Sequence, residues 1–219
     1  MILVDNKDIK VTPRWERTAT NLKEQMKNLN EAQRQSLINA NQRLWRNSNL
    51  KKELKKASHY KCWYCEREVT GFFGHVDHYR PKNNVKNKVG PDESGYWWLA
   101  FELSNYRIAC DLCNTYKSDN FPLLPGSTRG TSQTGINFEK TVLLDPVNIE
   151  DTELVWFQDN GILIARDGIS ETDTLRVQET ITILHLNHDE HLKSRIKLLR
   201  DCEELRIDLT IIYNKWKKK

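Results

Sequence analysis

The clearest hydrophobic pattern in the chain lies near its C-terminus, where apolar residues alternate with charged ones. The apolar positions are Leu192, Ile196, Leu199, Cys202, Leu205, Leu209, Ile212 and Trp216. They recur at steps of three and four residues, which is the spacing of one face of an α-helix. The pattern therefore predicts a long final helix, capped by Asn187 or Asp189. Because Cys202 lies on this face, we expect a core thiol there rather than a metal ligand.

Shorter apolar runs upstream predict β-structure. The runs 154–157 and 162–165 flank the Asn160-Gly161 step, whose residues accept positive φ, so they predict a β-hairpin. Thr141–Leu144 predicts a short buried strand that ends before a proline. The stretch 121–130 is rich in Pro, Gly and Ser and predicts a loop.

Capping residues divide the remaining helical stretches. The predicted helices run from Pro13 to Met26, over 31–40 after Asn30, over 50–57 after Ser48 or Asn49, and over 171–184. These elements suggest three segments. They are an N-terminal helical scaffold or docking segment (1–58), a central core (59–125), and a C-terminal extension of loop, hairpin and terminal helices (126–219).

Composition narrows the class of protein. A chain of 219 residues with seven Trp and seven Tyr can bury a good core, which argues against disorder. No apolar run approaches the roughly 18 residues of a membrane helix. The apolar run that follows Met1 is too short for a signal peptide, because it ends at the acidic residue Asp5. Four of the five cysteines form Cys-x-x-Cys pairs, which favours reduced, metal-binding thiols in the cytoplasm over disulfides.

The charge of the chain is nearly balanced overall but locally basic. The formal net charge is +4, so no global basic field indicates a nucleic-acid partner. Basic residues nevertheless gather on both sides of the central motifs: Lys51, Lys52, Lys55, Lys56 and Lys61 before them, and Arg80, Lys82, Lys86 and Lys88 within them. Such runs are often solvated surface, but their position here favours contact with phosphates.

Two Cys-x-x-Cys knuckles predict a zinc site. Cys62 and Cys65 form the first and Cys110 and Cys113 the second, a spacing that suits a tetrahedral ion. With sulfur in all four positions no place remains for water, so this zinc is expected to be structural and to support a thin core. A redox pair or plain buried cysteines are the alternatives.

The insertion between the knuckles carries His75-Val76-Asp77-His78. In a strand, His75 and Asp77 would lie on one face and His78 on the other. A bend at Asp77–His78, made plausible by Pro81, would let both side chains converge on one phosphate. Alone, this pattern is weak evidence, because His and Asp often share strands for structural reasons.

The ordered set from Cys62 to Lys117 resembles the HNH endonuclease family, whose core is a ββα-metal finger. The matching pattern is Cys-x-x-Cys, Asp-His followed by Pro, a middle Asn, and Cys-x-x-Cys-Asn-x-x-Lys. The resemblance implies an α+β fold, mainly helical around this zinc-braced finger. It also implies roles: His78 as the general base, Asp77 and Asn114 as ligands of one Mg²⁺ or Mn²⁺, and Asn105 as the residue that fixes the loop of the base. His75 is left open as a third ligand or a support.

Simple chemistry agrees with these roles. Hydrolysis of an anionic phosphodiester needs a cation on the developing charge and a base for the water. Hard oxygen donors suit Mg²⁺ whereas thiolates retain zinc, so one module can hold both metals. Arg80, Lys82 and Lys117 are candidates to bind neighbouring phosphates; for Arg80 and Lys82, ordinary surface charge is the alternative.

Motifs outside the finger resemble one HNH branch, the PtuB-type proteins. They include Tyr96-Trp97-Trp98-Leu99-Ala100, Leu143-Leu144-Asp145-Pro146, and the Leu186–Arg195 segment. The resemblance implies a nuclease of a Septu or retron-associated anti-phage system that works with an ABC/SMC-like ATPase of the PtuA type.

Two other interpretations stay open. The first is a zinc-finger module that binds nucleic acid or protein without catalysis, although such a module has no need of Asp77, His78 and Asn114 together. The second is a mobile-element or restriction endonuclease, which would need a sequence-reading element that we do not find. DNA and structured RNA both remain possible substrates.

Overall fold

The computed structural model describes residues 1–7, 9–87 and 91–217, without the side chain of residue 215, so Lys88 lies outside the described residues. The described residues contain seven α-helices and three two-stranded antiparallel sheets. This mixture accords with the predicted α+β class. No helix among the described residues is long and apolar enough to cross a membrane.

Three helices precede the central region: α1 (Pro13–Lys27), α2 (Glu31–Ala40) and α3 (Ser48–Ala57). All three predicted helices are confirmed, and side-chain caps explain where they begin. Asn30 caps α2 as predicted, and its side chain accepts from Gln33 N as part of a capping box. The third helix begins earlier than expected, because the Asn47 side chain caps it by accepting from Asn49 N and Leu50 N.

The central unit consists of two antiparallel strands followed by a helix. The strands are β1 (His75–His78) and β4 (Tyr106–Ala109), and the helix is α4 (Asp111–Lys117). His75 pairs with Ala109 and His78 with Tyr106, so the register continues to the end of β1. The long connection contains β2 (Asn84–Val85), β3 (Glu93–Ser94), and the 3₁₀ turns η1 (Trp97–Leu99) and η2 (Leu103–Asn105).

The C-terminal region contains η3 (Gly135–Phe138), α5 (Ile149–Thr152), β5 (Val155–Phe157), β6 (Leu163–Ala165), α6 (Glu171–Leu184) and α7 (Asp189–Trp216). The predicted hairpin is confirmed as β5–β6, with Gly161 at a φ of 79° in its turn. The predicted strand at 141–144 is wrong. Its residues are largely buried, but Thr141 forms one isolated bridge, and Leu144 N bonds Thr180 Oγ1 of α6 instead of a strand.

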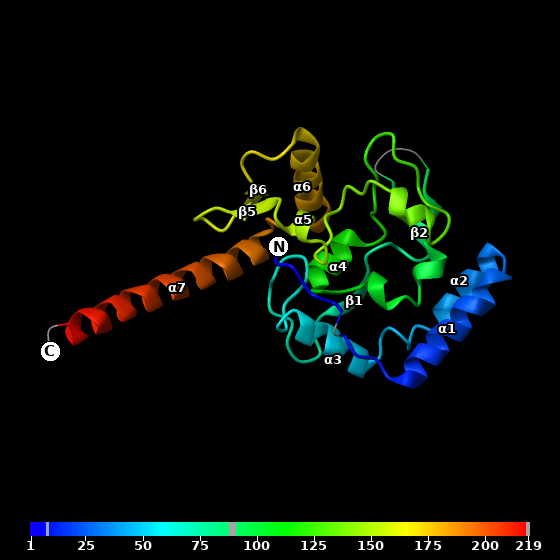
Figure 1. Cartoon of the computed structure of the whole chain (residues 1–219), viewed down its shortest axis with the longest axis horizontal. Helices are drawn as coiled ribbons and strands as arrows, with labels where there is room; N and C mark the ends of the chain where they lie inside the picture. Colours follow the sequence, from blue (N-terminus) through cyan, green and yellow to red (C-terminus); the bar gives the residue numbers. More distant parts are fainter. Residues whose placement is uncertain (8, 88–90, 218–219) are drawn as a thin grey trace.

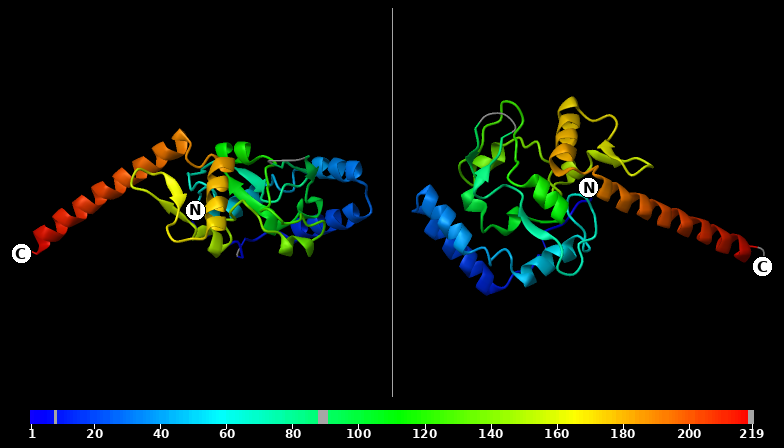
Figure 2. Two further views of the ribbon diagram at one scale, coloured as in Figure 1. Left: turned by 90° about the horizontal axis from the view of Figure 1, so that it is seen from above. Right: turned by 180° about the vertical axis from the view of Figure 1, so that it is seen from behind.

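The final helix is confirmed, but its environment is not the one expected. The His188 side chain caps α7, rather than Asn187 or Asp189. The helix then runs away from the rest of the molecule in every view (Figures 1 and 2). Cys202 is therefore exposed, and its prediction as a core thiol is wrong. A helical apolar stripe indicates that a face needs a partner, but it does not say that the partner belongs to the same chain.

Residues from all three predicted segments share one hydrophobic core. Among its fully buried members are Met26 and Leu54 before the central unit, Tyr64 and Ile108 within it, and Leu184 after it. The central unit is thus packed on both sides, which holds β1 and α4 in a fixed relation.

Candidate metal centre and active site

The four predicted cysteine ligands come together in the structure. The Sγ atoms of Cys62, Cys65, Cys110 and Cys113 all lie within 4.8 Å of one another, and all four residues are buried. The Sγ atoms of Cys65 and Cys110 are 3.6 Å apart. Four sulfurs around zinc, with bonds of about 2.3 Å, would lie about 3.8 Å apart. The cluster therefore fits a four-thiolate zinc ion.

Backbone hydrogen bonds shape the two knuckles. In the first, Cys62 N donates to Arg67 O at 2.7 Å, and Trp63 N donates to Ile108 O of β4 at 2.8 Å. In the second, Cys110 is the N-cap of α4, and its sulfur accepts from Cys113 N at 3.5 Å. The cluster thus joins the segment before β1 to the start of α4.

The chemistry of the cluster also suits a cation. The neighbouring thiols, Cys113 first, donate hydrogen bonds to the Cys110 sulfur and lower the pKa of the Cys110 thiol. Close thiols favour one deprotonated sulfur because the others then become its donors. Thiolates are the ligand form that binds zinc.

His191 lies against this centre, and the sequence pattern did not indicate it. It is 1% exposed, and its Nε2 is 3.8 Å from Cys113 Sγ. Because His191 is in the first turn of α7, this contact ties the base of the projecting helix to the metal centre. A His outside any metal-ligand spacing carries no local signal of such a contact.

Two side chains bind the carboxylate of Asp77, one from the first cysteine knuckle and one from α4. Tyr64 Oη donates to Asp77 Oδ2 at 2.6 Å, and Lys117 Nζ lies 3.1 Å from Oδ1 and 3.0 Å from Oδ2. His75, two residues earlier, also faces α4, because its Nε2 is 2.6 Å from Asp111 Oδ1. The predicted common face of His75 and Asp77 is confirmed.

Asn114 lies on α4 between these two contacts. Asp111, Asn114 and Lys117 are three residues apart in turn, so they share one face of the helix. That face contacts His75 at one end and Asp77 at the other. Asn114 therefore lies on α4 between the residue that contacts His75 and the residue that contacts Asp77.

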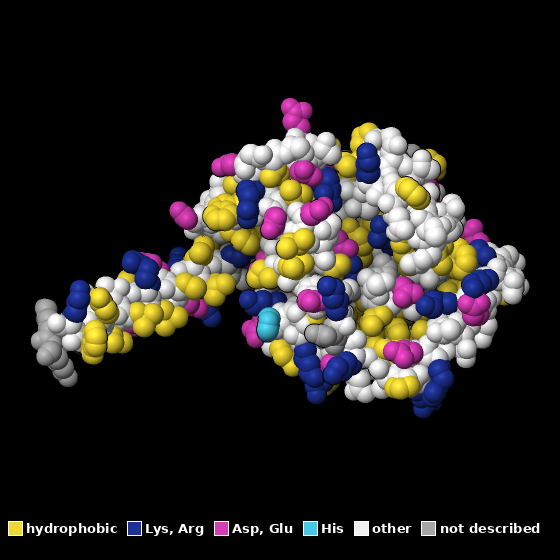
Figure 3. All heavy atoms as spheres, viewed as in Figure 1, with side chains coloured by type: hydrophobic (Ala, Val, Ile, Leu, Met, Phe, Trp, Pro, Cys, Tyr) yellow, Lys and Arg dark blue, Asp and Glu magenta, His cyan; other side chains and the backbone are white. Residues whose placement is uncertain are grey.

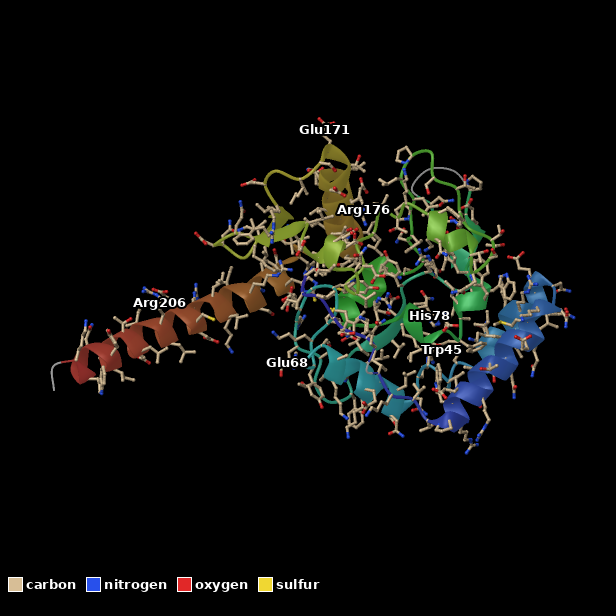
Figure 4. All side chains as sticks on the ribbon, viewed as in Figure 1. Trp45, Glu68, His78, Glu171, Arg176 and Arg206 are labelled. Atoms are coloured by element: carbon tan, nitrogen blue, oxygen red, sulfur yellow. The ribbon has the colours of Figure 1, made fainter. Side chains whose placement is uncertain are left out.

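His78 lies on the opposite face of β1, because the strand stays paired through His78 and makes no bend there. Figure 4 shows His78 beside Trp45 in the interior of the molecule. The ring of His78 makes edge contacts with Trp45 and Tyr106, at centroid distances of 5.0 and 5.1 Å. Burial, and then the ammonium of Lys82, lower the pKa of His78 well below its usual value, so the ring is neutral.

One hydrogen bond defines the tautomer of His78. Its Nε2 lies 2.9 Å from Ala100 O. A carbonyl oxygen accepts but cannot donate, so Nε2 carries the proton and the basic lone pair of the neutral ring is at Nδ1. Among the described residues no hydrogen bond to Nδ1 is found. The arrangement leaves one ring nitrogen able to take a proton.

Asn105 ties the segment after His78 to the chain around η1. Its Oδ1 accepts from Arg80 N at 2.9 Å, and its Nδ2 donates to Arg80 O at 2.9 Å and to Leu99 O at 3.3 Å. Leu99 directly precedes Ala100, whose carbonyl binds His78. Asn105 therefore holds together the two segments that orient the His78 ring.

The three predicted phosphate-binding residues lie in different environments. Arg80 pairs with Glu139, with Nε 3.0 Å from Oε2. Lys117 is fully buried and forms an ion pair with Asp77. Lys82 is partly buried with its Nζ 5.3 Å from the Trp45 ring, and it forms no ion pair with another described residue. Of the three, Lys82 is the one free to bind an anion next to His78.

Two of the lysines before the first knuckle have local partners. Lys51 Nζ donates to Phe72 O at 2.8 Å, and Lys55 Nζ donates to Gly71 O at 2.9 Å. These bonds hold the loop that leads into β1. For both lysines, the hydrogen bond to a carbonyl of this loop explains the presence of an ammonium group without contact to a phosphate.

Breaking the ion pair between Lys117 and Asp77 should strongly destabilise the protein. Lys117→Met leaves a buried carboxylate without its cation, and such losses cost about 3–5 kcal/mol. Lys55→Met is the matched control, because Lys55 is also buried but donates to a carbonyl alone, a loss of about 1–3 kcal/mol. Urea unfolding of both variants with saturating zinc measures the difference; equal losses would show that the ion pair adds nothing.

No family model matches the chain. The chain is similar to a curated protein, the Septu protein PtuB of Bacillus mycoides (strain KBAB4), with 29% identity over 170 residues. The match covers 75% of this chain and 56% of that relative, so the chain spans about half the length of the curated relative it matches. This likeness supports a relation to the Septu-type proteins.

Proposed function

We propose that the chain is a metal-dependent endonuclease of the HNH type that hydrolyses phosphodiester bonds. The observation that carries the proposal is the hydrogen bond from His78 Nε2 to Ala100 O. It presents a neutral imidazole whose Nδ1 can accept a proton, which is the state that a general base needs.

Asp77 and Asn114 would hold the divalent cation, with His75 as a further candidate ligand on the same face. Their carboxylate and amide oxygens are the hard donors that Mg²⁺ or Mn²⁺ prefers. When bound, the cation supplies stabilisation of the negative charge that develops on the phosphate. Lys117 and Tyr64 orient the Asp77 carboxylate, and Oδ1, which contacts Lys117 alone, keeps a further lone pair for a ligand.

Lys82 is proposed to bind a phosphate of the substrate beside His78. The pKa of Lys82 is lowered overall. Burial is the main cause, and the nearby carboxylates of Asp77 and Asp119 partly oppose it. A lysine ammonium is a compact point charge that suits a phosphate oxygen. The substrate class is a nucleic acid, either DNA or structured RNA.

The biological role that we propose is anti-phage defence. The likeness to the Septu protein PtuB supports this role. The resemblance to the PtuB-type branch further suggests a PtuA-type, ABC/SMC-like ATPase as the partner that recruits or restrains the nuclease. The reduced cysteine cluster agrees with a cytoplasmic place of action.

One observation favours a second candidate, a zinc-braced binding module without catalysis. Tyr64 and Lys117 already satisfy Asp77, and His78 is 5% exposed. A site of this kind could be purely structural, with buried polar groups paired for stability. Cleavage assays separate the two candidates.

The proposal is tested with a panel of DNA and RNA substrates in Mg²⁺ or Mn²⁺, with and without chelator. Wild type is compared with Asp77→Asn, alone and together with an ABC/SMC-like ATPase partner. We expect cleavage by wild type and at least about a 10²-fold loss in Asp77→Asn, because the amide removes the charge that holds the cation. Asp159→Asn, in the exposed hairpin turn, removes the same charge elsewhere and should cleave normally.

Zinc content and circular dichroism of each variant show whether the fold survives. If neither wild type nor variant cuts under any condition, yet both bind nucleic acid equally, the binding module is the better interpretation. Retained cleavage in Asp77→Asn would instead place the cation on other residues.

A further inference from the structure

The projecting part of α7 exposes a continuous apolar stripe. Leu205, Leu209 and Trp216 are 63%, 65% and 71% exposed, on a helix that the rest of the chain does not cover. Figure 3 shows hydrophobic side chains gathered along one side of this helix. Large apolar side chains in a row are costly to leave in water, so the stripe indicates an interface.

The spacing of the stripe is compatible with pairing between two helices. We call the row Leu198, Cys202, Leu205, Leu209, Ile212 and Trp216 the seam; Leu198, at 58% exposed, takes the place in this row that Leu199, at 43%, has in the stripe expected from the sequence. The seam residues follow one another at alternating steps of four and three residues, the heptad spacing of a two-stranded coiled coil. Over these six positions a straight 3.6-residue stripe has the same steps, so the charges that flank the seam are needed to identify its partner.

The seam begins where α7 leaves the body. Arg195, one step before Leu198 in the same heptad series, is held by the hairpin turn, with its Nη1 3.1 Å from Gly161 O. From residue 197 to residue 214 every residue of the helix is exposed. No described segment of the chain therefore competes for the seam.

We propose that the seam pairs with the seam of a second copy of this chain in a parallel coiled coil. Charge complementarity supports this occupant. Asp201 and Arg206 flank the seam on opposite sides, at the heptad positions that pair between parallel strands. Asp201 of each copy thus meets Arg206 of the other. In the single chain Arg206 pairs with Glu203 at 2.6 Å, an exposed contact that contributes little and is easily exchanged.

The opposite orientation brings like charges together. In an antiparallel pair centred on Ile207, Leu205 would pack on Leu209, Arg206 would face Arg206, and Asp208 would face Asp208. Like charges at these flanking positions disfavour a pairing. The two orientations also place Cys202 differently. Parallel strands bring the two Cys202 residues opposite each other, whereas antiparallel strands place Cys202 opposite Ile212.

Disulfide formation between two Cys202 residues therefore distinguishes parallel from antiparallel pairing in the full chain. It is the exposed one of the five cysteines, since the other four lie in the buried cluster. Treatment with oxidised glutathione should join two Cys202 thiols in a disulfide, as the two thiols lose two protons and two electrons and the reagent becomes two reduced glutathione molecules. The facing positions of a parallel dimer lie within the range of disulfide geometry. Cys202→Ser should give no covalent dimer but keep twice the 25.8 kDa mass in sedimentation.

Two variants on the same helix distinguish specific pairing through the seam from nonspecific hydrophobic association. Leu209→Glu places a charge in the seam and should raise the dimer dissociation constant by at least about tenfold and abolish the cross-link. Ile207→Glu is the matched control, because Ile207 is 46% exposed but lies on the opposite side of the helix. It should keep both the dimer and the cross-link.

Charge reversal tests the orientation. Arg206→Asp should weaken the dimer, and Asp201→Arg combined with Arg206→Asp should restore it. A wild-type monomer across a concentration series would overturn the proposal. A dimer without the Cys202 cross-link would overturn the parallel pairing. Equal effects of Ile207→Glu and Leu209→Glu would show that the seam is not the dimer interface.

Discussion

Cleavage should fall by about 10²–10⁴-fold when His78 is replaced with glutamine, the range that a positioned general base typically contributes. The substitution is chosen because the amide of glutamine can still donate to Ala100 O, as His78 Nε2 does at 2.9 Å. It removes the basic nitrogen at Nδ1 while it keeps the donor that anchors the side chain. Single-turnover cleavage of the preferred substrate, at saturating Mg²⁺, measures the loss.

A second variant at the same position distinguishes chemistry from packing. His78→Ala empties the space between Trp45 and Tyr106, whose rings lie 5.0 and 5.1 Å from the imidazole. Added imidazole can enter such a cavity and accept the proton in place of the side chain. We expect partial recovery of cleavage in His78→Ala and none in His78→Gln, where the space is filled. Full activity in either variant would remove His78 from the role of base.

Loss of the thiolate cluster should unfold the central unit. Binding of structural zinc by small modules is worth on the order of 10–16 kcal/mol, which exceeds or matches the total stability of most domains. Cys110→Ser removes one zinc ligand, while the serine hydroxyl can still cap α4, so the variant tests the loss of the metal ligand rather than of the cap. We expect less than one zinc per chain by metal analysis and a large fall in melting temperature.

The exposed cysteine provides the control for this experiment. Cys202→Ser is the same chemical change on α7 and should leave zinc content unchanged. A strong chelator should lower the melting temperature of wild type and of Cys202→Ser alike, but that of Cys110→Ser little. Full zinc occupancy with unchanged melting in Cys110→Ser would remove the structural role of the cluster.

The local signals in the sequence were reliable where neighbouring residues decide the structure. The Asn30 cap and the Asn160-Gly161 turn both formed as expected, because each depends on contacts within a few residues. Metal-ligand spacing was equally informative, since two residues between thiols are enough to wrap one edge of a tetrahedron. The four thiols accordingly lie within 4.8 Å of one another.

Predictions failed where distant segments decide the outcome. Thr141–Leu144 has the composition of a strand, yet Thr180 of α6 takes the hydrogen bond that a neighbouring strand would have made. Cys202 has the spacing of a core residue, yet the helix leaves the body before reaching it. In both cases the local pattern correctly indicated a face that needs a partner but could not identify the partner.

By itself, the sequence determined α1–α3, α6, α7, the hairpin and the pairing of two cysteine knuckles around an Asp-His strand, because propensity, capping and ligand spacing act over a few residues. The tertiary structure alone decided which groups surround Asp77 and His78. Tyr64, Lys117, Ala100 and Trp45 reach them from other parts of the chain. Such contacts depend on how separate elements pack. The free energy of that packing is shared among many residues, so no short motif determines it.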